Sequence, residues 1–170
     1  AGQGQNPAVW SLLRKSPLPI SSGILAEWDT TVLADGSYSL KLEAEDLSGN
    51  VTLQIITIIV DNTPPSPPAL LSAINNGVDV ALTWLANTDA DLAGYLLYRN
   101  DQLANGTGVM VRNLKPYQLA GTTYLDKALP DGKYAYYLVA MDQAGNVGNL
   151  SNSLQVTIDI RPPHATITDP

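Results

Sequence analysis

The sequence has no cysteine, no phenylalanine and a single histidine, His164, among its 170 residues. Without cysteine it can form neither a disulfide bond nor a thiolate metal site. One histidine beside a proline pair does not provide a Ser-His or Cys-His relay. The 9 lysines and arginines are outnumbered by 16 aspartates and glutamates, and the resulting net charge of −7 argues against binding to nucleic acid or to an anionic membrane surface. No apolar run is long enough for membrane insertion.

One segment of the chain occurs twice. Residues 33–51 match residues 129–147, each 96 positions later and without a gap. Both copies contain the pattern Asp-Gly-X-Tyr, at 35–38 and at 131–134. A period of this size is typical of a β-sandwich domain and too long for a solenoid repeat. We therefore expect a tandem array of domains.

Most of the chain has the pattern of β-strands. Tyr38, Leu40 and Leu42 alternate with polar residues, which is the period of two of a half-buried strand. Apolar residues do not recur at helical spacing, so no helix is predicted. About four strands are expected before residue 61, including one at 51–60. The strands predicted in the second half are 69–74, 78–85, 94–100, 117–120, 122–125, 133–141 and 150–159.

The segment 63–68 contains four prolines, Pro64 and Pro65 among them. Each proline fixes its own φ and restricts the residue before it, so this segment is predicted to be a stiff, extended linker. It separates a first domain at 1–62 from a second at 69–160.

Three segments of the second half, 80–84, 92–100 and 129–134, resemble bacterial fibronectin type III domains. The resemblance implies an antiparallel β-sandwich with Trp84 in its core. It also implies that Tyr134 is the corner tyrosine, with a buried ring and a hydroxyl bonded to nearby backbone.

The first half, through 4–10, 25–31 and 35–42, is similar to a bacterial immunoglobulin-like repeat. We expect Tyr38 there to be architectural, as Trp84 is. The fold class is therefore predicted to be all-β, with tandem immunoglobulin-like and fibronectin type III antiparallel sandwiches.

The resemblance also predicts that the first domain is incomplete at its N-terminus, because such repeats open with further strands. The segment 161–170 has the pattern of a first strand. Two interpretations are open: it starts a following domain, or it is a strand donated to the open first domain of another copy.

No catalytic residue is predicted. Glu43 and Glu45 alternate along the polar face of one strand, where solvated acids are expected. We therefore expect a protein segment that is not an enzyme.

Several oxygen-bearing side chains are expected near the junction of the two domains. Calcium takes 6–8 oxygen ligands, so such a cluster could bind it and stiffen the hinge. The other interpretation is that these residues cap turns by bonding to backbone amides. No other cofactor is predicted. The candidate residues are Asp35, Asp61, Asn62, Asp89, Asp91 and Asp142.

A second candidate surface is the outer face of strand 133–141, where Tyr137, Val139 and Met141 replace the polar residues of the first copy. Either a partner covers this face or the segment between residues 100 and 117 does. Trp10 and Trp28 are further candidates, for stacking on a sugar.

These observations predict a structural spacer and interaction module of a larger bacterial protein, extracellular or at the cell surface. The predicted partners are neighbouring domains of the same polypeptide. Adhesion to a glycan or to another protein, and self-assembly through the tail, are the alternatives.

Overall fold

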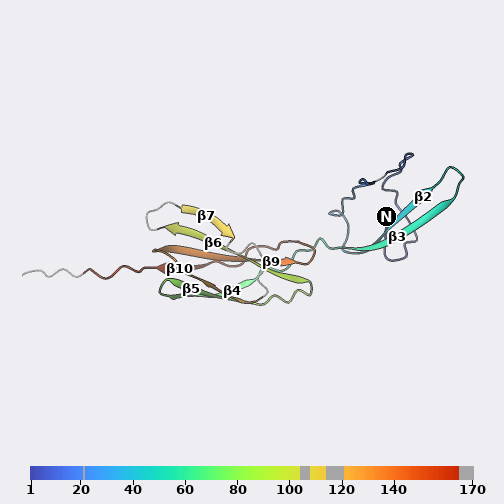
Figure 1. Ribbon diagram of the computed structural model, residues 1–170. Coiled ribbons are helices and arrows are strands. Elements are labelled where there is room, and N and C mark those ends of the chain that lie inside the picture. The colour runs from blue at the N-terminus through green and yellow to red at the C-terminus, as the bar shows by residue number, and fades with distance from the viewer. Residues whose placement is uncertain (21, 104–107, 114–120, 165–170) are drawn as a thin grey trace, which may run out of the picture. The chain divides into compact units, whose positions relative to one another are not determined.

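The computed structural model describes residues 1–20, 22–103, 108–113 and 121–164, and every regular element in these residues is a β-strand (Figure 1). The strands pair antiparallel. The predicted all-β fold is therefore confirmed. The chain divides into two compact units, Ala1–Thr63 and Pro64–Pro170.

Unit 1 holds one three-stranded sheet in its described residues, in the order β1-β2-β3. We expected about four strands here, and the difference arises because residues 4–20 and 22–35 form turns and irregular segments. Figure 1 shows β2 and β3 as a long hairpin. The strands are β1 (Gly2–Gln3), β2 (Gly36–Glu45) and β3 (Val51–Val60).

Unit 2 has two sheets, a three-stranded sheet in the order β4-β5-β8 and a four-stranded sheet in the order β10-β9-β6-β7. The strands are β4 (Ala69–Asn76), β5 (Asp79–Leu85), β6 (Leu92–Leu103), β7 (Gly108–Asn113), β8 (Thr123–Asp126), β9 (Gly132–Asp142) and β10 (Leu154–Ile158). Two antiparallel sheets that enclose one core are the arrangement of a β-sandwich.

The core of unit 2 forms because its strands alternate. In β9 the buried residues Tyr134, Tyr136 and Leu138 face inward at every second position. From the other sheet, Trp84 packs edge-on against Tyr95 with ring centroids 5.6 Å apart. These contacts bury large aromatic rings between the two sheets, together with aliphatic side chains of both.

The repeat is visible in the turns that follow β2 and β9. Asp46 accepts hydrogen bonds from the main-chain N–H of Asn50 at 2.9 Å, and Asp142 accepts one from Asn146 at 2.8 Å. Each turn contains a glycine, Gly49 in the first and Gly145 in the second, with φ of 83° and 93°. Glycine adopts a positive φ without the steric cost of a side chain.

Candidate functional site

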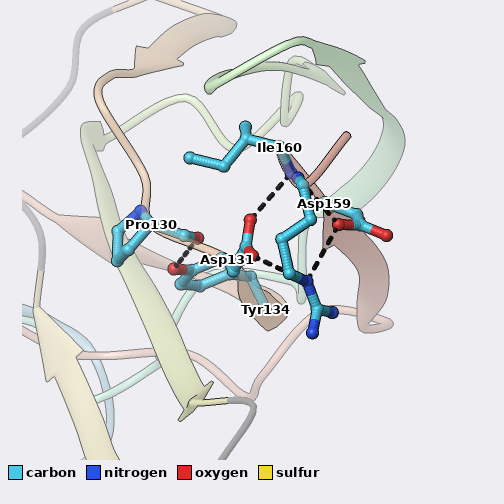
Figure 2. Close-up of polar contacts among 6 residues, drawn as sticks. Pro130, Asp131, Tyr134, Asp159 and Ile160 are labelled. Atoms are coloured by element: carbon cyan, nitrogen blue, oxygen red, sulfur yellow. Dashed lines mark hydrogen bonds and ion pairs between the residues drawn. The ribbon is translucent and has the colours of Figure 1, made fainter. Parts of the chain in front are cut away.

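The best-defined polar arrangement lies where unit 2 ends (Figure 2). The buried Tyr134 donates its hydroxyl to the carbonyl of Pro130 at 2.7 Å, as a corner tyrosine does. Asp131, which follows Pro130 in the chain, accepts the main-chain N–H of Ile160 at 2.7 Å and pairs with the Arg161 guanidinium at 3.0 Å. Asp131 therefore holds Ile160 and Arg161, the second and third residues after the last strand, β10.

The same arrangement closes unit 1. Tyr38 donates its hydroxyl to the carbonyl of Ala34 at 2.9 Å. Asp35 accepts the main-chain N–H of Asn62 at 2.7 Å and the hydroxyl of Thr63. These two donors, the Thr63 hydroxyl first, hold the pKa of Asp35 below its usual range.

We call Asp35, Asn62 and Thr63 the exit clamp of unit 1, and Asp131, Ile160 and Arg161 the exit clamp of unit 2. In each clamp a second aspartate, Asp61 or Asp159, accepts the main-chain N–H of the residue two positions later, at 3.2 Å or 3.1 Å. In unit 1 the Asn62 side chain also donates to two carbonyls, of Thr30 at 2.8 Å and Leu33 at 3.1 Å. Each proline pair is therefore preceded by a fixed backbone.

The first residues of unit 2 are also held. Pro65 is buried, whereas Pro64 is exposed. Pro65 lies close to Gly148. A Cβ added to Gly148 would be 2.5 Å from the Pro65 carbonyl oxygen. The Ser66 carbonyl accepts from the Asn87 side chain at 2.6 Å. Residues 64–66 are thus part of unit 2.

Hydrogen bonds within the units occupy most of the acids predicted to bind calcium. Asp89 accepts from Asn87 at 3.1 Å and from the main-chain N–H of Ser66 at 3.2 Å, and these donors lower its pKa. Burial acts to raise the pKa of Asp142, but donation from Asn146 together with the main-chain N–H groups of Gly145 and Ala144 outweighs it and lowers the pKa. These contacts favour the interpretation as turn caps.

Within unit 2, the carboxylates of Asp91 and Asp142 lie within 4.8 Å of each other. Two carboxylates supply fewer oxygens than the 6–8 that calcium takes. Calcium binding at the junction, with Asp35, Asp61 and Asn62 from unit 1, stays a prediction.

The other candidate side chains lie on different surfaces. On the outer face of β9, Val139 is buried and Tyr137 and Met141 are half-buried. Of the segment expected to cover them, residues 101–103 and 108–113 are described and belong to β6 and β7, in the same sheet as β9. Its other residues, like the predicted strand at 117–120, lie outside the described residues. The use of this face by a partner stays a prediction.

The two tryptophans of unit 1 both make contacts within the unit. Trp28 packs edge-on against Tyr38, with ring centroids 5.7 Å apart. Trp10 lies under the Lys41 ammonium, 5.2 Å from the ring centroid. Both remain half-buried.

Sequence reasoning missed a buried polar network in unit 2. Asp126 accepts from the Arg99 guanidinium at 2.8 Å and from the Tyr136 hydroxyl at 2.8 Å. Arg99 also lies 5.4 Å from the centroid of the Tyr134 ring. A signal was present in the sequence, because Arg99 follows Tyr95 and Leu97 on alternate positions of the strand, and a charge on a core-facing position requires a partner.

No family model matches the chain. Among curated proteins it is 30% identical over 167 residues to Exoglucanase B of Cellulomonas fimi, covering 91% of this chain and 14% of that protein. It is 35% identical over 99 residues to Chitinase Chi52 of Paenibacillus xylanexedens, covering 57% of this chain and 17% of that protein. It is 29% identical over 134 residues to Chitinase A1 of Niallia circulans, covering 72% of this chain and 18% of that protein. The chain thus spans less than a fifth of the length of these relatives.

Among solved structures, the FN1–FN3 domains of chicken CNTN1 match with a TM-score of 0.55 and 16% identity, covering 78% of this chain and 45% of that one. The fibronectin type-III domain of human fibronectin type III domain containing protein 3 matches with a TM-score of 0.44 and 19% identity. This match covers 58% of this chain and 90% of that one. The structural neighbours are fibronectin type III domains. The likeness to CNTN1 supports the β-sandwich fold. Membership of unit 1 in an immunoglobulin-like family is not shown and stays a prediction.

Proposed function

We propose that this chain is a non-catalytic spacer and interaction module in a larger extracellular bacterial protein. The observation that carries the proposal is the exit clamp, which occurs in both units. In each clamp an aspartate accepts a main-chain N–H and a side-chain donor, which is the Thr63 hydroxyl in unit 1 and the Arg161 guanidinium in unit 2. In each clamp an aspartate of the Asp-Gly turn fixes the direction of the backbone before a proline pair. Proline then limits the freedom of the residues that follow. Such a device controls spacing and does no chemistry.

Three further observations support the proposal. The curated relatives are named as an exoglucanase and two chitinases, and the chain spans only a small part of each. No helix that could span a membrane is present in the residues that the structure describes. Apart from the buried Asp126, most of the hydrogen bonds that aspartates accept in both units are those of turns and clamps. We infer that the parent protein acts on a polysaccharide and that its catalytic groups lie in other domains.

The spacer function can be tested by a distance measurement between the two units. Because the chain has no cysteine, single cysteines can be introduced at exposed Glu43 and Lys133 and spin-labelled. Pulsed electron paramagnetic resonance is expected to give one narrow distance distribution. Asp35→Ala should broaden the distribution, because Asn62 and Thr63 lose their acceptor.

The matched control is Asp131→Ala, which removes the same acceptor from the clamp that follows the last strand of unit 2 and takes no part in the connection between the units. It should leave the distribution narrow. Asp35→Asn, which keeps an acceptor oxygen, should restore most of the narrow distribution. A broad distribution in the unmodified chain would refute the spacer proposal.

Glycan binding is the second candidate, and the names of the relatives favour it. Trp10 is the ring to test, because it is half-buried and already lies beneath a cation rather than in the core. Saturable retention of the chain on insoluble glucan or chitin, lost in Trp10→Ala and kept in Trp28→Phe, would establish it. Equal retention of wild type and Trp10→Ala would refute this site.

A further inference from the structure

β2 of unit 1 and β9 of unit 2 occupy matching positions in the repeat. They also pair in the same register with the strand that follows. Tyr38 lies opposite Ile58 in β3, and Tyr134 lies opposite Val156 in β10. The two hairpins can therefore be compared residue by residue.

This comparison shows that unit 1 exposes a face that unit 2 buries. Leu138 in β9 is fully buried, whereas Leu42, its match in β2, is 50% exposed. Ala140 is fully buried, whereas Ala44, its match, is exposed. An apolar strand face of this kind is stable in water only when another element covers it.

The strand beside β9 shows what is incomplete in unit 1. β6 pairs with β9 along its length, from Leu92 opposite Asp142 to Leu103 opposite Gly132. β1 pairs with β2 only at Gly2 opposite Ser39 and Gln3 opposite Tyr38.

The short strand β1 occupies the place of the last part of β6. Asn100 of β6 lies opposite Ala135, which matches Ser39, so Gly2 stands where Asn100 stands in unit 2. Both strands run antiparallel to their partner. Toward its N-terminus, β1 therefore points along the uncovered part of β2, from Leu40 to Glu45.

The edge of β2 is free to pair in this region. The Ser37 carbonyl accepts from the Gly4 N–H at 2.7 Å on the β1 side. Because main-chain groups alternate between the two edges of a strand, those of Lys41, Glu43 and Glu45 face the same side. Among the described residues no strand pairs with them.

Ala1 already has the geometry of a residue inside a strand. Its nitrogen donates to the Ser11 carbonyl at 2.7 Å, and its carbonyl accepts from the Ser11 N–H at 2.7 Å. A peptide nitrogen at this position would make the same bond.

We propose that the polypeptide segment immediately preceding Ala1 in the longer protein continues β1 as an antiparallel strand along β2. Covalent continuity with β1 favours this occupant over a strand from another molecule, because the segment is held at the edge at high effective concentration. The segment completes the edge of the sheet and adds apolar side chains to the face of Leu42 and Ala44.

The register specifies which residues of this segment are apolar. Ala1 stands at the place of Arg99, so the second residue before Ala1 takes the place of Leu97, opposite Leu42. The fourth takes the place of Tyr95, opposite Ala44. Leu97 and Tyr95 are both buried in unit 2. We expect apolar residues at these two positions and polar residues to be tolerated at the first and third.

The test is amide hydrogen exchange, measured by nuclear magnetic resonance, on residues 1–170 and on the same chain extended by about ten residues of its natural upstream sequence. In the extended chain, the Lys41 and Glu43 amides should exchange at least about tenfold more slowly. The Leu42 amide, which already faces β3, is the internal control and should change less. Unchanged exchange at Lys41 and Glu43 would overturn the proposal.

A single substitution distinguishes pairing of the upstream segment with β2 from a general stabilisation of unit 1 by that segment. Glu43→Pro removes a donor only from the open edge, where proline is tolerated, so it should leave residues 1–170 folded. In the extended chain it should cancel the slower exchange at Lys41. If residues 1–170 instead protect these amides by themselves, in a manner that depends on protein concentration, the occupant is a second copy and the proposal is wrong.

Discussion

At the scale of single residues, the buried Asp126 shows how the core of unit 2 accommodates charge. One carboxylate oxygen of Asp126 accepts from both Arg99 and Tyr136. Removing either donor would leave the carboxylate with less compensation for its lost hydration, which is more costly than losing an exposed ion pair. Residues 27 positions apart in sequence meet here, so the sequence could predict a need for a partner but not its identity.

The Tyr136 hydroxyl gives this network a dependence on pH. Burial, and then the hydrogen bond to Asp126, raise its pKa above the usual value. An unfolded tyrosine ionises near pH 10, so its contribution to stability is complete below about pH 10 and declines as the pH rises further.

Tyr136→Phe should therefore lower the free energy of unfolding of unit 2 by about 1–3 kcal/mol at neutral pH. It should also make the decline above pH 10 shallower. Urea unfolding at a series of pH values, followed by the amide signals of β9, measures both effects. Parallel pH profiles for wild type and variant would contradict the assignment of the decline to this hydroxyl.

At the scale of elements, the start of unit 2 depends on a glycine that makes room for the chain. The ideal Cβ at Gly148 would lie 2.5 Å from the Pro65 carbonyl oxygen, and the Gly148 N–H donates to the Ala140 carbonyl at 2.9 Å. The segment at Pro65 is consequently packed against the unit that it leads into.

Gly148→Ala should destabilise unit 2 by about 1–3 kcal/mol, because the backbone at Pro65 must shift away. Gly121→Ala is the matched control, since no atom lies within 4 Å of its added Cβ. Thermal unfolding of the two variants measures the difference. Equal melting temperatures would show that the Pro65 contact is not needed for stability.

The sequence predicts the bounds of some strands more accurately than those of others. β3 has the predicted bounds, 51–60, because it is apolar throughout and lies between clear turns. β10 begins at Leu154 rather than at residue 150. Ser151 and Asn152 instead bond through their side chains, to the Leu138 N–H and to the backbone of Leu70. β7 (Gly108–Asn113) was not predicted, since glycine and polar residues precede it.

The clamps were predicted only in part. The sequence repeats the Asp-Gly turn and the acid before each proline pair, and these matches are visible by alignment. The bond from Asp131 to the Ile160 N–H joins residues 29 positions apart, and only the pairing of β9 with β10 brings them together. The predicted linker at 63–68 is divided by the structure, because Thr63 is clamped in unit 1 and Pro65 is buried in unit 2.

At the scale of the whole molecule, the two units differ in how much core they contain. Unit 2 encloses a buried apolar cluster between two sheets. In unit 1 the single sheet of the described residues leaves Leu53, Ile55 and Ile59 exposed. Because stability grows with buried apolar area, unit 1 is expected to be the less stable of the two.

The full chain should therefore unfold in two steps, with unit 1 unfolding at the lower urea concentration. Hydrogen exchange measured by mass spectrometry at increasing urea resolves them, since peptides from β2 and β9 report on different units. Coincident loss of protection in both peptides would mean that the two units unfold cooperatively.

The clamp has a consequence for the evolution of such proteins. Every atom of the unit 2 clamp comes from the domain that it closes, from the Asp-Gly turn to the residues after the last strand. Duplicating or deleting a gene segment that encodes one domain would thus carry the whole clamp with it. Arrays of different length could arise by recombination without any compensating mutation at the new boundary, and natural variants should differ by whole domains rather than by parts of them.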